Sequence, residues 1–149
     1  MTAVVFTPVD HPYDAVRTGG WPLDAPYVEQ CFTPVVGPTV VLLLRRMPSL
    51  WAEAVPSVDL VELSLSLGLG RGTGERSAIV RTLDRLVGFN LGRLVTKTAD
   101  LVEIDVFLQV PNLSHRRLEK VPACTIAVHD RFTGQSMAAR IGGTGAPPR

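Results

Sequence analysis

A run of alternate glycines divides the chain near its midpoint and limits what can form there. These glycines are Gly68, Gly70, Gly72 and Gly74. Glycine loses more backbone freedom on folding than any other residue, so this run argues against a helix or strand that crosses it. After a strand, such a run is typical of a loop that holds the phosphate of a nucleotide. Between two helices, it is a long, flexible turn.

The segment before the glycines, residues 58–69, fits both a strand and a helix. Its apolar residues alternate, as in a half-buried strand, but several of its leucines also share one helix face. Asp59 and Glu62 have the spacing of a capping box, with Asp in place of the usual Ser or Thr. Most of the apolar residues are leucine, which forms helices well. These two facts favour a helix.

The segment after the glycines, residues 77–89, has the clearest helical periodicity. At about 100° per residue, its apolar side chains fall on one face, while Arg81 and Arg85 fall on the opposite face. No register of the glycine run matches the dinucleotide fingerprint, and the Gly-Lys pair of a Walker loop is absent. The sequence therefore predicts a turn between two helices, made cationic by Arg71 and Arg76.

Further elements are predicted on both sides of this helix pair. A first helix begins at residues 37–39, because proline suits a first helical turn, and Pro48 is expected to kink or end it. Alternating apolar residues predict a hairpin at about residues 93–109, with its turn at residues 98–100. A last helix follows, with Ser114 as its cap and a proline that interrupts it.

The two ends of the chain show no sustained periodicity. Residues 1–36 contain five prolines and a Gly-Gly pair, which predicts an irregular arm with a short strand at residues 3–7. The arm is rich in aromatic residues, so we expect some of them to pack onto the domain. They include Tyr13, Trp21, Tyr27 and Phe32. Residues 133–149 are expected to form a flexible tail, which leaves residues 37–132 as the domain.

Charge is distributed unevenly along the chain. The net charge is +1, but residues 1–70 carry three basic and seven acidic residues, whereas residues 71–149 carry twelve basic and seven acidic ones. The second half is therefore the better place for a polyanion. Cys31 and Cys124 have no paired spacing, which argues against a disulfide framework or a zinc ribbon, and we expect both thiols to be reduced.

Nothing in the sequence indicates export or membrane insertion. The first residues lack the pattern of a signal peptide. The longest apolar run, residues 40–44, is much shorter than a membrane span requires. We therefore expect a soluble, cytoplasmic protein that does not bind membranes.

The order helix, helix, glycine turn, helix, hairpin, helix is that of a winged helix, in which the third helix reads DNA and the hairpin is the wing. The segments DLVELSLSLGLG…GERSAIVRTLDRLVGFNLGRL and VPNLSHRRLEKVPACTIAVHDRF resemble a family of small actinobacterial winged-helix proteins of unassigned function, over about residues 37–132. The resemblance implies an α+β winged helix-turn-helix fold. Wings of that family often carry arginine where this chain has Glu103 and Asp105, which argues against DNA contact by this strand.

The sequence is interpreted as a non-catalytic protein that binds duplex DNA and regulates transcription, without a cofactor or metal. Because one winged helix reads few base pairs, a homodimer is included in this interpretation. Arginine commonly recognises guanine, and basic residues hold phosphates. Base contacts are assigned to Arg81 and Arg85 with Ser77 and Thr82 beside them, and phosphate contacts to Arg71, Arg76 and Lys97.

Two other functional classes stay open. A winged helix can also bind another protein, for which the almost neutral charge, the acidic wing and the aromatic-rich arm would be suitable. A thiol enzyme that uses Cys124 has less support. His129 lies five residues after Cys124, on another face of a helix, which argues against joint metal ligation. A continuous basic surface would favour DNA, and a broken one with an exposed apolar patch would favour a protein partner.

Overall fold

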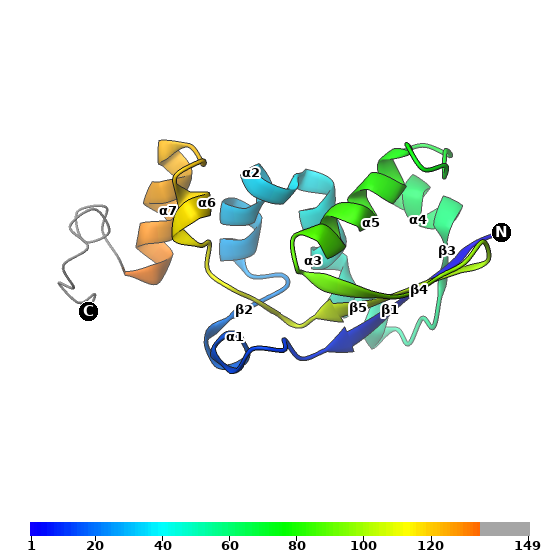
Figure 1. Cartoon of the computed structure of the whole chain (residues 1–149), viewed down its shortest axis with the longest axis horizontal. Helices are drawn as coiled ribbons and strands as arrows, with labels where there is room; N and C mark the ends of the chain where they lie inside the picture. Colours follow the sequence, from blue (N-terminus) through cyan, green and yellow to red (C-terminus); the bar gives the residue numbers. More distant parts are fainter. Residues whose placement is uncertain (135–149) are drawn as a thin grey trace.

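The structure is a computed structural model of the chain, in which residues 1–134 are described. The fold is α+β and combines short and long helices with two β-sheets (Figure 1). In chain order, the elements are β1 (Ala3–Val9), α1 (Asp14–Gly19), β2 (Trp21–Pro22), the π-helix η1 (Val28–Phe32), α2 (Thr33–Val36), α3 (Pro38–Ala52), β3 (Val58–Asp59), α4 (Leu60–Ser66), α5 (Ala78–Gly88), β4 (Gly92–Lys97), β5 (Leu101–Phe107), β6 (Gln109–Val110), α6 (His115–Leu118) and α7 (Ala123–Thr133).

The main sheet has four strands in the order β3-β1-β5-β4. Strands β4 and β5 form the predicted hairpin, and β1 pairs with β5 in parallel, from Ala3 opposite Leu101 to Val9 opposite Phe107. Figure 1 shows α3, α4 and α5 on one side of this sheet, and α6 and α7 at the end of the molecule away from the N-terminus. A second sheet pairs β2 with β6.

Residues 1–36 are not the irregular arm that their proline content predicts. They form β1, α1, β2, η1 and α2, and their apolar side chains lie in the same core as those of α3 and α5. Pro8 is tolerated in β1 because β3 pairs only with Ala3 and Val4, so β1 is an edge strand at Pro8. The expected packing of the aromatic residues is confirmed for Tyr27 and Phe32, which are buried.

Helix α3 is continuous, although Pro48 was expected to kink or end it. It runs from Pro38 to Ala52 with Pro48 inside. The last turn is held by tertiary contacts: Met47 is fully buried, and Trp51 Nε1 donates a hydrogen bond to the Phe6 carbonyl of β1 at 2.9 Å. These contacts offset the loss of one backbone hydrogen bond at the proline.

The elements around the glycine turn agree with the local sequence patterns. Residues 60–66 form helix α4, and Asp59 caps it by accepting a hydrogen bond from the Glu62 N–H. The hairpin turn at residues 98–100 is closed by Thr98, whose Oγ1 accepts from the Leu101 N–H at 3.0 Å. The expected tail, residues 133–149, falls almost wholly outside the described residues.

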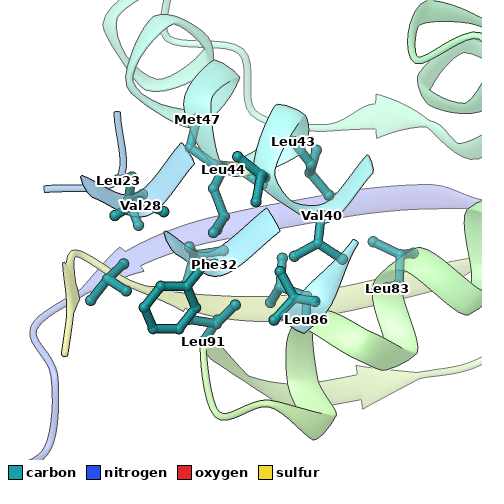
Figure 2. Packing of buried hydrophobic residues seen from close by; sticks show 14 of the residues in the cluster. Leu23, Val28, Phe32, Val40, Leu43, Leu44, Met47, Leu83, Leu86 and Leu91 are labelled. Atoms are coloured by element: carbon teal, nitrogen blue, oxygen red, sulfur yellow. The ribbon is translucent and has the colours of Figure 1, made fainter. Parts of the chain in front are cut away.

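The core is centred on one face of α3. Figure 2 shows Val40, Leu43 and Leu44 of α3 in one cluster with Phe32, which precedes α2, and Leu86 of α5. All of these side chains are buried. The covered sheet face adds Val4 and Phe6 of β1 and Ile104 of β5 to the same cluster. The N-terminal segment and the domain therefore share one core.

A buried hydroxyl joins the N-terminal segment to the last helix. Tyr27 is fully buried, and its Oη lies 2.7 Å from Nδ1 of His129 in α7. The same oxygen accepts a hydrogen bond from the Leu113 N–H at 2.9 Å. Trp21 stacks on the Tyr27 ring, with centroids 4.7 Å apart. Burial raises the pKa of Tyr27, so the phenol stays protonated at neutral pH.

Substitution by alanine should have opposite effects on stability at Gly88, the last residue of α5, and at Gly92, the first residue of β4. A Cβ on Gly92 would lie 2.5 Å from the Asp105 carbonyl oxygen and 2.7 Å from Leu86 Cδ2, so Gly92→Ala should lower the free energy of unfolding by about 1–3 kcal/mol. Gly88 is helical and its Cβ would meet no atom within 4 Å, so Gly88→Ala should raise it by up to about 1 kcal/mol. Urea unfolding measures both, and equal effects would contradict the packing described for Gly92.

Removal of the Tyr27 hydroxyl should destabilise the fold. Tyr27→Phe leaves the Leu113 N–H and the His129 ring nitrogen without this partner, at a cost of about 1–3 kcal/mol. Tyr13→Phe is the matched control, because Tyr13 is 70% exposed, and its unfolding midpoint should stay unchanged. Thermal unfolding of the two variants distinguishes them. A Tyr27→Phe protein as stable as the wild type would rule out a structural role for this hydroxyl.

Candidate nucleic-acid interface

Helix α5 begins where the glycine turn ends, because Ser77 caps it. Ser77 Oγ accepts a hydrogen bond from the Val80 N–H at 3.4 Å and donates one to the Gly74 carbonyl at 2.6 Å. The predicted site residue Ser77 is therefore half-buried at the N-terminal end of α5, and its hydroxyl is engaged in the cap.

Thr82 is not accessible to DNA, in contrast to its predicted role. Its side chain is only 2% exposed. Thr82 Oγ1 donates a hydrogen bond to the Ala78 carbonyl at 2.8 Å and lies 3.1 Å from Thr39 Oγ1 of α3. The prediction for Thr82 is wrong, because this position lies on the side of α5 that packs against α3.

The two arginines of α5 are exposed, as their position opposite the apolar face predicts. Neither Arg81 nor Arg85 belongs to an ion pair within residues 1–134. Arg85 extends over the start of α3, since a Cβ built on Gly37 would lie 3.2 Å from Arg85 Nη1. The exposed side of α5 therefore carries two guanidinium groups that are available to a ligand.

The glycine turn presents two more exposed arginines. Gly68 and Gly70 have φ angles of +75° and +82°, a conformation that favours glycine. Ser64 Oγ of α4 donates a hydrogen bond to the Gly70 carbonyl and so holds this part of the turn. Arg71 and Arg76 follow, and neither is ion-paired in the described part of the chain.

The hairpin places Lys97 on one face and Glu103 and Asp105 on the other. Lys97 at the end of β4 is opposite buried Val102 of β5, so its side chain leaves the sheet on the helix side. Glu103 and Asp105 alternate with the buried residues and point away from the helices. Asp105 Oδ2 also lies 2.8 Å from Arg93 Nη2. The acidic character of this strand is therefore directed away from α5 and partly neutralised.

We call the exposed charged residues of the glycine turn, of α5 and of the end of β4 the basic stripe. It consists of Arg71, Arg76, Arg81, Arg85 and Lys97 together with Glu75 and Asp84. The stripe carries five positive and two negative charges, so it is positive but interrupted. Leu94 and Val95 of β4 are 43% and 53% exposed on the neighbouring hairpin. The surface thus combines a cationic face with an exposed apolar patch.

A second group of basic residues, in and after α6, contacts the C-terminal end of α5 through Arg117. The Arg117 guanidinium of α6 lies 4.7 Å from the centroid of the Phe89 ring, just after α5. Arg116 and Lys120 of the same region are exposed. The sequence shows this charge cluster, but only the fold brings it to the end of α5.

A pocket opens between α5 and the hairpin, and we call it the helix–hairpin pocket. Its volume is about 380 Å³. Apolar side chains from α4, α5 and both hairpin strands line it, and Thr2, Glu75, Asp84 and Lys97 contribute polar groups. No local pattern in the sequence predicts this pocket, because its walls come from segments that are far apart in the chain.

A second pocket of about 490 Å³ adjoins the first and shares Val87 and Leu94 with it. His11 lies in its wall and is buried against Phe107, with ring centroids 5.0 Å apart. Burial and, to a smaller extent, Arg17 lower the pKa of His11. The neutral ring accepts a hydrogen bond from the Tyr13 N–H at Nδ1.

Cys124 and His129 lie in different environments. Cys124 is exposed, whereas His129 is 3% exposed and bonded to Tyr27. Within residues 1–134, no cluster of three or more His, Cys, Asp or Glu side chains is arranged to hold a metal ion. The helices in this part of the chain are also too short or too polar to cross a membrane.

Comparisons with protein-family models, with curated proteins and with solved structures found no match to this chain. The assignment of the interface therefore rests on the geometry and charges described above.

The two thiols should differ strongly in reactivity. Cys31 is fully buried, and burial raises its pKa to about 11, whereas Cys124 is exposed. A thiol reagent at pH 8 should modify Cys124 readily and Cys31 only after unfolding, because the thiolate is the reacting form. Cys124→Ser should remove the fast reaction. Rapid modification of two thiols in the folded protein would contradict the burial of Cys31.

Proposed function

We propose that residues 37–132 form a winged helix that binds duplex DNA and regulates transcription. Elements α3, β3, α4, α5, β4 and β5 follow one another in the order of such a domain, with α5 as the reading helix and the β4–β5 hairpin as the wing. The motifs of residues 37–132 that resemble small actinobacterial winged-helix proteins are in keeping with this proposal. β1 would then be an addition that lies between β3 and the wing.

The exposed, unpaired arginines of α5 carry this proposal. In a solvated helix face, arginines commonly pair with a carboxylate three or four residues away. Arg81 and Arg85 have no such ion pair within residues 1–134, although Asp84 lies three residues after Arg81. Arginine on a helix in the major groove is the commonest reader of guanine. Arg71, Arg76 and Lys97 would hold the phosphates on either side.

In this proposal, Thr82 plays no part in DNA contact and Ser77 acts only as the helix cap. Two copies of the chain would bind adjacent half-sites, since one reading helix contacts few base pairs. A cytoplasmic location is part of this proposal, because the sequence resembles bacterial proteins, whose DNA lies in the cytoplasm.

A protein partner is the second candidate, and the exposed apolar side chains of β4 favour it. Leu94 and Val95 lie on an edge strand, where a partner could contact them. The N-terminal arm is less suitable for docking than its sequence suggests, since Tyr27 and Phe32 are buried in the core.

Single substitutions on α5 test the DNA proposal. Arg81→Ala and Arg85→Ala should each weaken binding to a selected duplex by about 1–3 kcal/mol and relax its sequence preference. The free energy of unfolding should change little, because both side chains are exposed. Arg45→Ala is the matched control: Arg45 is an exposed arginine of α3 that pairs with Glu29, and its loss should leave DNA binding unchanged.

A salt series completes the experiment. Binding to random duplex DNA should weaken steeply with salt concentration, and Arg71→Ala should reduce that slope. If wild type, Arg81→Ala and Arg85→Ala bind equally at matched salt, α5 is not the reading helix. If the wild type shows no salt-dependent binding, the protein partner becomes the better explanation.

A further inference from the structure

The helix–hairpin pocket has an apolar wall that the fold leaves uncovered. Leu94 of β4 lies opposite buried Ile104 in the sheet, on the face that packs against the helices, yet Leu94 is 43% exposed. Val80 and Val87 of α5 line the same pocket and are half-buried. A ligand with an apolar body would remove these surfaces from water, which is favourable. A concave, mostly apolar site of this size suits a small organic molecule.

The polar groups of the pocket set the charge that such a ligand would need. Thr98 Oγ1 is already engaged in the hairpin turn, and Thr2 Oγ1 donates to the Ala99 carbonyl. The charged lining groups are Glu75, Asp84 and Lys97, and none of them is ion-paired within residues 1–134. Two carboxylates and one ammonium leave an excess of negative charge at the pocket.

The adjoining pocket lacks this feature. No carboxylate lines the adjoining pocket. Apart from His11, its only ionisable side chain with a charge at neutral pH is Arg93, which is paired with Asp105. The unpaired carboxylates of the helix–hairpin pocket are therefore specific to that site.

We propose that the helix–hairpin pocket binds a small organic cation, a compact apolar body that carries one ammonium group. The apolar body lies against Val80, Val87 and Leu94, and the ammonium group pairs with Asp84 and Glu75. Opposite charge gives the site its preference for an amine over an alcohol or an acid of the same shape.

The site is coupled to DNA binding, a part of the inference that rests on the proposed function. Asp84 and Glu75 belong to the basic stripe, where their charges repel a phosphate backbone. A bound cation neutralises this repulsion and so strengthens DNA binding. By reciprocity, DNA strengthens the binding of the cation by the same factor.

The first experiment uses the folded full chain without DNA and three probes that share one ring system. They are 1-naphthylmethylammonium, 1-naphthylmethanol and 1-naphthoate, each titrated by calorimetry and followed by NMR. The ammonium probe should bind about fivefold or more tightly than the alcohol, because each exposed ion pair contributes up to about fivefold. The carboxylate should bind most weakly.

Variants locate the binding. Asp84→Asn and Glu75→Gln should each weaken the ammonium probe about two- to fivefold and leave the alcohol unchanged, as expected for exposed ion pairs. Both positions are exposed, so both variants should fold. Glu119→Gln removes an exposed carboxylate outside the pocket and should change neither probe. Val87→Phe should fill the pocket and weaken all three.

The outcomes separate clearly. Equal binding of ammonium and alcohol, or preference for the carboxylate, would overturn the assignment of a cation. Absence of binding by every probe at millimolar concentration would overturn the site itself. Loss of binding in Glu119→Gln to the same extent as in Asp84→Asn would show non-specific charge attraction and also overturn it.

A second measurement tests the coupling. The ammonium probe should tighten DNA binding by wild type several-fold at fixed salt, and Asp84→Asn should bind DNA more tightly without the probe and respond to it less. This variant also controls for direct binding of the probe to DNA. A cation-selective pocket with unchanged DNA affinity would overturn the coupling alone. Absence of DNA binding in all conditions would refute the proposed function while the probe titrations still decide the site.

Discussion

The parallel pairing of β1 with β5 is the interaction on which the rest of the structure depends. It extends the hairpin into a sheet broad enough to cover the helices, and it brings Val4 and Phe6 into the core beside Ile104. At the first residue of β1, the Ala3 N–H donates a hydrogen bond to the Asp100 carbonyl at the hairpin turn. A two-stranded hairpin alone is marginally stable in water. Residues near the start of the chain thus support the element proposed as the wing.

Short sequence patterns predicted the helices and strands that begin and end at clear capping residues or follow a clear apolar periodicity. Capping residues and periodicity located α4 and α5, and alternation located the hairpin. Features that depend on distant contacts were missed. β1 is central only because of β5, and α3 passes Pro48 because Trp51 is anchored on β1. Thr82 illustrates the same limit at the candidate site: a helical wheel gives its angle, but only the position of α3 shows that it is buried.

Helix α5 serves three environments at once. Ile79 and Leu86 face the core, Val80 and Val87 face the helix–hairpin pocket, and Arg81 faces solvent. All three sets of side chains belong to one continuous helix. The pocket wall and the proposed reading side are therefore parts of one helix, which is joined to α3 by the hydrogen bond between the Thr39 and Thr82 hydroxyls.

The distance along the chain between β1 and β5 has a consequence for biosynthesis. Ala3 pairs with Leu101, so the strand made first waits for a partner made nearly one hundred residues later. At about 5–20 residues per second, that delay lasts on the order of 5–20 seconds. During this interval Val4 and Phe6 have no β5 to pack beside, and an apolar strand with open edges invites association with other nascent chains. The same pairing that completes the sheet therefore leaves β1 without its partner strand until β5 has been synthesised.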